Sequence, residues 1–240
     1  MLHSILGDSI RLLREPFNGL SHLLAAFLSL GAVWIFSHRV TGDAVKRASL
    51  LFFGWTLVLL FTMSALYHLP RWSPTGLEWA RRLDHAAIFL LILGTYTGIC
   101  VNILSSSWRV CILALVWTVG LLGIAEKLLF FCLPDTASVS LYVAMGWTGV
   151  GAFPLLARTF GPSPLLWIVG GGLSYTFGAL VEYLPLRLAG SWLTPHEFFH
   201  VTVLLGAFLH FRFVLRYVVP FPRVPWVNSF SLSILSQRSH

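Results

Sequence analysis

The chain has 240 residues, of which 57% are hydrophobic and only 10% are charged, and its mean hydropathy is +0.80. A soluble domain carries about a quarter charged residues, so this composition excludes a water-facing surface and indicates an integral membrane protein. The net charge of +7 does not indicate a nucleic-acid partner, because the basic residues are scattered at the ends of apolar runs, where lipid headgroups lie. Cys100, Cys111 and Cys132 all lie in or beside apolar runs, and they form neither a disulfide framework nor a cysteine-based zinc site.

The first residues of the chain do not have the pattern of a signal peptide. Their apolar side chains recur at roughly helical spacing and are interrupted by charge; they are Leu2, Ile5, Leu6, Ile10 and Leu13. This spacing predicts a helix that lies at the membrane interface ahead of the first span.

Seven apolar stretches of about twenty residues follow, each long enough to cross a bilayer. The predicted spans are residues 18–37, 48–68, 86–104, 108–126, 138–157, 164–184 and 197–219. Between the second and third spans, Thr75 and Glu78 have the spacing of a capping box, which predicts a short surface helix. The predicted fold is all-α, a seven-transmembrane helix bundle that forms one membrane domain over residues 1–219. The tail, residues 220–240, is rich in Pro and then in Ser, and we expect it to be disordered.

An odd number of spans places the two termini on opposite sides of the membrane. The positive-inside rule does not say which side is cytoplasmic, because seven basic residues fall on the N-terminal side and nine on the other. Charge alone therefore leaves the orientation open.

Polar side chains gather at one end of the predicted bundle. Odd spans start and even spans end on the N-terminal side, and the following residues all fall there: Glu15, Asn18, His22, Ser64, His68, Asp84, His85, Glu126, Glu182, His196 and His200. Ionisable groups near or within membrane helices are costly, so this gathering indicates a functional site.

The histidines in this group have the spacing of metal ligands. His196 and His200 are four residues apart and share one face of a helix, and His68 can supply a third nitrogen from the second span. Three neutral histidines leave one position of a tetrahedral zinc open, which is the catalytic pattern rather than the closed structural one. Ser64 lies one turn deeper than His68, and Asp84 could act as a general base.

The segment TPHEFFHV, residues 194–201, also matches the H-E-x-x-H signature of zinc proteases, in which Glu197 would be the general base. An intramembrane protease of this kind needs an Asp in a later span as its third ligand. The last Asp of the chain is Asp135, in a predicted loop. We therefore assign Glu197 to the start of a helix, where the helix dipole favours a negative charge and where Pro195 is a common first residue.

Four motifs together resemble the hemolysin III family, the bacterial branch of the progestin and adipoQ receptor superfamily. They are EPFNGLSH (15–22), SALYH (64–68), RRLDHAAIFLLILGTYTG (81–98) and HEFFHVTVLLGAFLHF (196–211). The resemblance covers nearly the whole chain apart from the tail. It implies a seven-helix fold in the bacterial inner membrane, with the N-terminus cytoplasmic, the C-terminus outside and zinc near the cytoplasmic leaflet. It also implies that His68, His196 and His200 bind the zinc, with Ser64 and Asp84 beside it.

The leading hypothesis is a hydrolase that uses Zn²⁺ to cleave a lipid amide or ester bond. Asp84 would be the base, and Ser64 would orient water or the oxyanion. The superfamily is also similar to alkaline ceramidases, so the resemblance implies a ceramide-like or other acyl-lipid substrate among the membrane lipids. Glu15, Asn18, His22, His85 and Glu197 are interpreted as polar residues that support the site or the fold.

Two other functions remain open at this stage. One is a membrane receptor or lipid-state sensor in which zinc only holds helices together. The other is a channel-forming cytolysin, although no ring of charges lines any single span. The sequence gives no oligomeric state.

Overall fold

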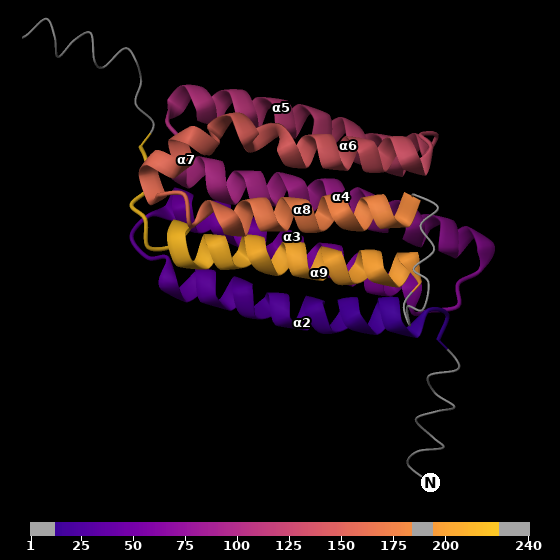
Figure 1. The fold of residues 1–240 in the computed structure, drawn as a ribbon. Coiled ribbons are helices and arrows are strands. Elements are labelled where there is room, and N and C mark those ends of the chain that lie inside the picture. Colours follow the sequence, from indigo (N-terminus) through magenta and orange to yellow (C-terminus); the bar gives the residue numbers. More distant parts are fainter. Residues whose placement is uncertain (1–12, 184–193, 226–240) are drawn as a thin grey trace, which may run out of the picture.

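The computed structural model describes residues 13–183 and 194–225, and every regular element in these residues is helical (Figure 1). The elements are α2 (Pro16–Arg39), α3 (Ala44–His68), α4 (Pro74–Ile103), α5 (Ser106–Ala125), η1 (Glu126–Phe130), α6 (Asp135–Trp147), η2 (Thr148–Ala152), α7 (Phe153–Phe160), α8 (Leu165–Tyr183), α9 (Pro195–Phe213) and η3 (Val214–Val218). They run side by side, with α5 and α6 at one edge of the bundle and α2 at the other (Figure 1). The interfacial helix predicted near the N-terminus lies almost wholly outside the described residues.

Seven helical segments of the described chain are long and apolar enough to cross a membrane. They are Pro16–Arg39, Ala44–His68, Pro74–Ile103, Ser107–Phe130, Asp135–Phe160, Leu165–Tyr183 and Pro195–Val218. The prediction of an all-helical protein with seven membrane-length helices is confirmed. The outer faces fit a lipid environment, since Leu24, Phe27 and Leu28 on α2 are 61%, 64% and 70% exposed.

The helix bounds lie within a few residues of the predicted spans, except at the start of the third. The separate surface helix predicted there is wrong, because α4 runs unbroken from Pro74 to Ile103. Ser73, rather than Thr75, caps this helix, and its hydroxyl accepts a hydrogen bond from the Gly76 N–H at 3.2 Å. Pro74 and Gly76 lie in the first turn, and no Gly or Pro occurs from Leu77 to Asp84, so the helix continues without a break to Asp84.

Small residues let two pairs of helices approach closely. A Cβ atom on Gly94 of α4 would overlap the side chain of Thr56 on α3, and one on Gly178 of α8 would overlap Thr202 on α9. Close backbone approach of this kind is the usual basis of helix association in membranes. These contacts fix α4 against α3 and α8 against α9, and these four helices carry most of the polar residues described below.

Residues 219–225 are tied to the far end of the bundle, where α3 begins and α9 ends. The Lys46 ammonium donates hydrogen bonds to the carbonyls of Val219 at 2.7 Å and Phe221 at 2.6 Å. The Arg109 guanidinium donates to the Val224 carbonyl at 2.6 Å, and the Val224 N–H donates to the Asn102 carbonyl at 3.0 Å. Residues 220–225 of the predicted tail therefore contact the bundle, and the remainder of that tail, residues 226–240, lies outside the described residues.

Replacing Lys46 by Met should destabilise the protein, because it leaves two partly buried carbonyls without their donor. An unpaired buried acceptor costs about 1–3 kcal/mol, so the loss should be on the order of 2 kcal/mol. Thermal unfolding in detergent measures it. The matched control is Arg47→Met, which changes the exposed neighbouring cation. Equal melting temperatures for the two variants would contradict the role given to Lys46.

Candidate metal centre

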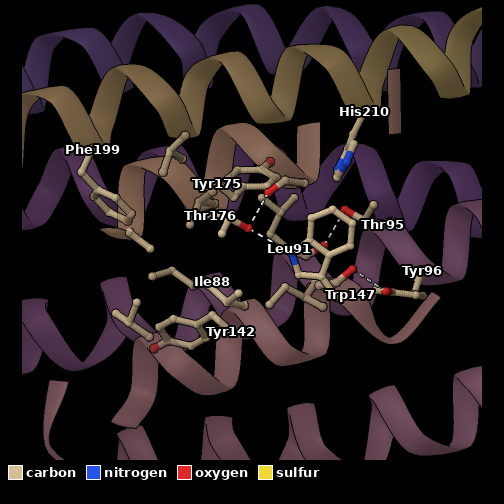
Figure 2. A pocket seen from close by; sticks show the side chains of 18 of the residues that line it. Ile88, Leu91, Thr95, Tyr96, Tyr142, Trp147, Tyr175, Thr176, Phe199 and His210 are labelled. Atoms are coloured by element: carbon tan, nitrogen blue, oxygen red, sulfur yellow. Dashed lines mark hydrogen bonds between the residues drawn. The ribbon is translucent and has the colours of Figure 1, made fainter. Parts of the chain in front are cut away.

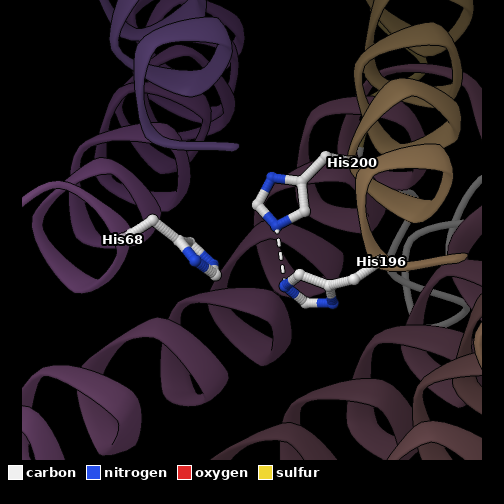
Figure 3. A group of neighbouring side chains, drawn as sticks. All are labelled: His68, His196 and His200. Carbon is white, nitrogen blue, oxygen red and sulfur yellow. Dashed lines mark hydrogen bonds between the residues drawn. The ribbon is translucent and has the colours of Figure 1, made fainter. Parts of the chain in front are cut away.

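Three histidine side chains converge between the end of α3 and the start of α9 (Figure 3). One nitrogen of each of His68, His196 and His200 lies within 4.8 Å of the others, and the Nε2 atoms of His196 and His200 are 3.3 Å apart. Two nitrogens bound to one tetrahedral zinc at about 2.0–2.1 Å lie roughly 3.3 Å apart. His68 and His200 are only 1% and 2% exposed. The spacing and chemistry of this donor set fit a zinc ion.

Local sequence fixes where α9 begins and hence where its two histidines lie. The Thr194 hydroxyl accepts a hydrogen bond from the Glu197 N–H at 3.2 Å, and the Glu197 carboxylate accepts one from the Thr194 N–H at 2.8 Å. This capping box, with Pro195 in the first turn, starts the helix just before His196. The Glu197 carboxylate thus turns back onto the helix start, as expected for a capping residue.

Two of the three histidines are oriented by carboxylates. His68 Nδ1 lies 2.6 Å from a Glu15 oxygen, and His196 Nδ1 lies 3.1 Å from a Glu182 oxygen. An Nδ1–H that donates to a carboxylate leaves Nε2 free to bind a metal. The sequence placed Glu182 at this end but did not assign it to the site. Its position at the end of the sixth span was the only available signal.

Glu15 has further partners that hold it in place. The Asn18 side-chain amide donates to it at 3.1 Å, and the Arg14 guanidinium lies 3.1 Å away. Burial acts to raise the pKa of Glu15. The hydrogen bond from Asn18 and the interaction with His68 outweigh it, so the pKa lies below its ordinary value. Glu15 is therefore suited to remain a carboxylate beside His68.

Asp84 and Ser64 lie beside the histidines on α4 and α3. The Ser64 hydroxyl is within hydrogen-bonding reach of the Asp84 carboxylate, and both residues line the same cavity as His196 and His200. The structure therefore brings together a carboxylate, a hydroxyl and three imidazoles at one end of the bundle.

Two other polar residues of this end are engaged elsewhere. His85 bonds through Nδ1 to the Arg81 carbonyl at 2.9 Å, and its Nε2 lies 3.9 Å from Asp135 at the start of α6. Glu126 accepts hydrogen bonds from the backbone N–H groups of Cys132 and Leu133, which closes the turn after η1. Neither residue takes part in the histidine cluster.

An apolar cavity of about 410 Å³ extends from the histidine cluster into the bundle, and Figure 2 shows part of its wall. Its walls come from α4, α6, α8 and α9 and include Ile88, Leu91, Tyr142, Tyr175 and Phe199. Two polar side chains of the wall donate to neighbouring groups: Trp147 Nε1 donates to the Thr176 hydroxyl at 3.0 Å, and the Tyr96 hydroxyl donates to the Gly146 carbonyl at 2.7 Å. The interior thus suits a hydrocarbon chain.

Comparison with known proteins gives one family. Residues 10–211 match the family described as Haemolysin-III related. Hemolysin-3 of Bacillus cereus is 31% identical over 211 residues, which cover 86% of this chain and 92% of that protein. The Hemolysin-3 homolog of Bacillus subtilis (strain 168) is 31% identical over 215 residues, which cover 87% and 96%. With seven membrane-length helices, the chain is an integral multi-pass membrane protein that belongs to the hemolysin III family.

Proposed function

We propose that this protein is a zinc-dependent hydrolase that cleaves the amide or ester bond of an acyl-lipid. The proposal rests on the position of the polar side chains at the end of the cavity. Three histidine nitrogens, the Asp84 carboxylate and the Ser64 hydroxyl meet at one end of an apolar cavity. Metal ligands, a general base and a site for a hydrocarbon chain are the three parts that lipid hydrolysis needs.

Each residue of the site would have a separate role in hydrolysis. Zinc, when bound, supplies a Lewis acid to a carbonyl and makes water nucleophilic near neutral pH. Asp84 takes a proton from the attacking water at a carboxylate oxygen and later gives it to the leaving amine or alcohol. Ser64 donates its one hydroxyl hydrogen to the Asp84 carboxylate, and once Asp84 has taken a proton the hydroxyl can instead donate to the oxygen of the attacked carbonyl. Glu15 and Glu182 keep a proton on the Nδ1 atoms of their histidine partners, so that each Nε2 stays free.

The cavity supports a long-chain lipid as the substrate. Its lining on α4 extends from Asp84 to Cys100, which is about 24 Å at 1.5 Å per residue. The hydrocarbon core of a bilayer is about 30 Å thick, so one acyl chain, which spans half of it, fits within the cavity. The reactive bond would then lie at the polar end, beside the histidines.

We place the metal centre and the N-terminus on the cytoplasmic side of the bacterial inner membrane and the C-terminus outside. The start of α2 lies at the metal-centre end and residues 219–225 lie at the other (Figure 1). Each test cysteine is introduced into a variant of the protein in which the three native cysteines are replaced. An impermeant thiol reagent applied to spheroplasts, where it reaches only the outer face, should label Pro225→Cys and spare Arg14→Cys. The reverse pattern would overturn this orientation.

Incubation with total membrane lipids tests the function. Zinc-loaded protein should release fatty acid together with an amine or alcohol, detected by mass spectrometry, and zinc-stripped protein should release neither.

A second candidate function is a lipid-state sensor in which zinc only holds two helices together. It is favoured by the position of the histidines, which lie on both α3 and α9. That function predicts a lower melting temperature after chelation and no product from any lipid pool.

A further inference from the structure

Four buried polar atoms beside the candidate metal centre make no hydrogen bond of ordinary geometry in the described chain. They are Asn18 Oδ1, both ring nitrogens of His22, and His200 Nδ1. These side chains are buried, with exposures of 5%, 3% and 2%. An unpaired buried polar group costs about 1–3 kcal/mol, so four of them in contact with one site call for a physical reason.

The three histidines of the cluster are not supported equally. Glu15 holds Nδ1 of His68, and Glu182 holds Nδ1 of His196, whereas His200 has no carboxylate partner. A neutral histidine that binds a metal through Nε2 carries its proton on Nδ1, and that proton needs an acceptor. Figure 3 shows this second nitrogen of His200 pointing away from His196. The ring of His22 lies close by in a tilted stack, with its centroid 4.2 Å from that of His200 and the two planes inclined by 37°, so a turn of the His22 ring would bring its nitrogen into line with His200 Nδ1.

We propose that His22 bridges His200 to the polar face of α2 when the metal is bound. His22 accepts the Nδ1–H of His200 on one ring nitrogen and donates the N–H of its other nitrogen to Asn18 Oδ1. Asn18 and His22 are four residues apart on α2 and therefore share one face. A neutral imidazole has one acceptor and one donor, so two hydrogen bonds satisfy all four unpaired atoms.

The bridge would connect two metal ligands through a helix that supplies none. The Asn18 amide already donates to Glu15 at 3.1 Å, and Glu15 lies 2.6 Å from His68 Nδ1. The chain of hydrogen bonds then runs from His200 through α2 to His68, and it fixes both rings. This inference rests on the proposed zinc site. It makes His22 a positioning residue that acts through His200, because outer partners of this kind set the orientation and basicity of a ligand.

The test is the zinc affinity of the full-length protein in detergent, measured by competition with a chelator. His22→Leu should weaken binding by about 10–100-fold, the usual cost of an outer partner. His22→Gln should recover most of the loss, because an amide also offers one donor and one acceptor. The control is His210→Gln. His210 is a histidine of α9 outside the cluster, and its Nε2 bonds to the Ile168 carbonyl. This variant should stay within about twofold of the wild type, below the range expected for an outer partner.

Two further readouts separate positioning from a general effect on the fold. The melting temperature of the zinc-free protein should fall little in His22→Leu, since the ring makes no hydrogen bond of ordinary geometry there and only approaches the His200 backbone carbonyl. Asn18→Leu should also weaken zinc binding, and the double variant should lose less than the sum of the two, because both break one chain of hydrogen bonds.

The outcomes distinguish the bridge from the metal site itself. If His22→Leu binds zinc as tightly as the wild type while His68→Ala does not, the bridge is wrong and the zinc site stands. If His22→Gln is as weak as His22→Leu, or if the two losses are additive, the bridge is also wrong. If the wild type binds no zinc, or if His68→Ala keeps it, the proposed site fails and the bridge fails with it.

Discussion

Replacing Asp84 by Asn is expected to lower lipid hydrolysis by about 10²–10⁴-fold while the protein keeps its zinc. Asn has the same shape as Asp and can still contact Ser64, but it cannot take a proton from water. None of the three histidines proposed as ligands is changed, so the metal should remain. Product formation by mass spectrometry and zinc content by elemental analysis, measured on the same preparation, check both halves of the prediction.

Glu197→Gln is the matched control for Asp84→Asn, because it neutralises the other carboxylate that sequence alone offers as a base. Its activity should stay within a few fold, since a glutamine oxygen can still accept the hydrogen bond from the Thr194 N–H. An inactive Glu197→Gln beside an active Asp84→Asn would assign the base to the H-E-x-x-H glutamate. Loss of zinc in Asp84→Asn would make Asp84 a ligand and not the base.

His68→Ala is expected to remove the zinc from a protein that otherwise holds it near stoichiometrically. One of three nitrogens disappears, and the remaining pair on α9 is left to bind the ion alone. The loss of affinity should exceed the roughly 10–100-fold that the removal of an outer partner costs. Elemental analysis after exhaustive dialysis measures it, and hydrolysis should disappear in parallel.

The control for His68→Ala is His85→Ala, a histidine at the same end of the bundle whose ring bonds to the Arg81 carbonyl. It should keep its zinc, because His85 does not belong to the cluster of three. If both variants keep zinc, the ligands lie elsewhere. If both lose it, the whole polar end responds to any change and the assignment to His68 is unsupported.

The seven-helix fold and the convergence of polar residues could be predicted from sequence. Apolar length gives the helices, and the alternation of direction from one span to the next brings His68 to the same end as His196 and His200. The four-residue spacing then puts the last two on one face. These features depend only on the length and period of a helix, which the sequence displays directly.

The partners of each imidazole could not be predicted, because they depend on helix rotation and rotamers that hydrophobic periodicity does not specify. Glu182 could be placed at the correct end, but its contact with His196 requires the close approach of α8 to α9 that Gly178 permits. His22 could be placed near the site, but its position against His200 comes from the packing of α2 on α9.

The far end of the bundle shows a second limit. Proline-rich composition after residue 220 suggested a disordered tail, yet Lys46 and Arg109 reach backbone carbonyls of residues 219–224. Basic residues at the ends of apolar runs were expected to face lipid headgroups. Lys46 and Arg109 are instead buried at 8% and 0% exposure, because long cationic side chains can satisfy several carbonyls at once.

Zinc-edge X-ray absorption of the purified, zinc-loaded protein tests the proposed metal centre most directly. The spectrum should show three imidazole nitrogens from His68, His196 and His200 at about 2.0–2.1 Å and no sulfur ligand. In His68→Ala the imidazole contribution should fall or the metal should be absent. A sulfur shell, or an unchanged three-imidazole spectrum in His68→Ala, would contradict the site on which the proposed hydrolase depends.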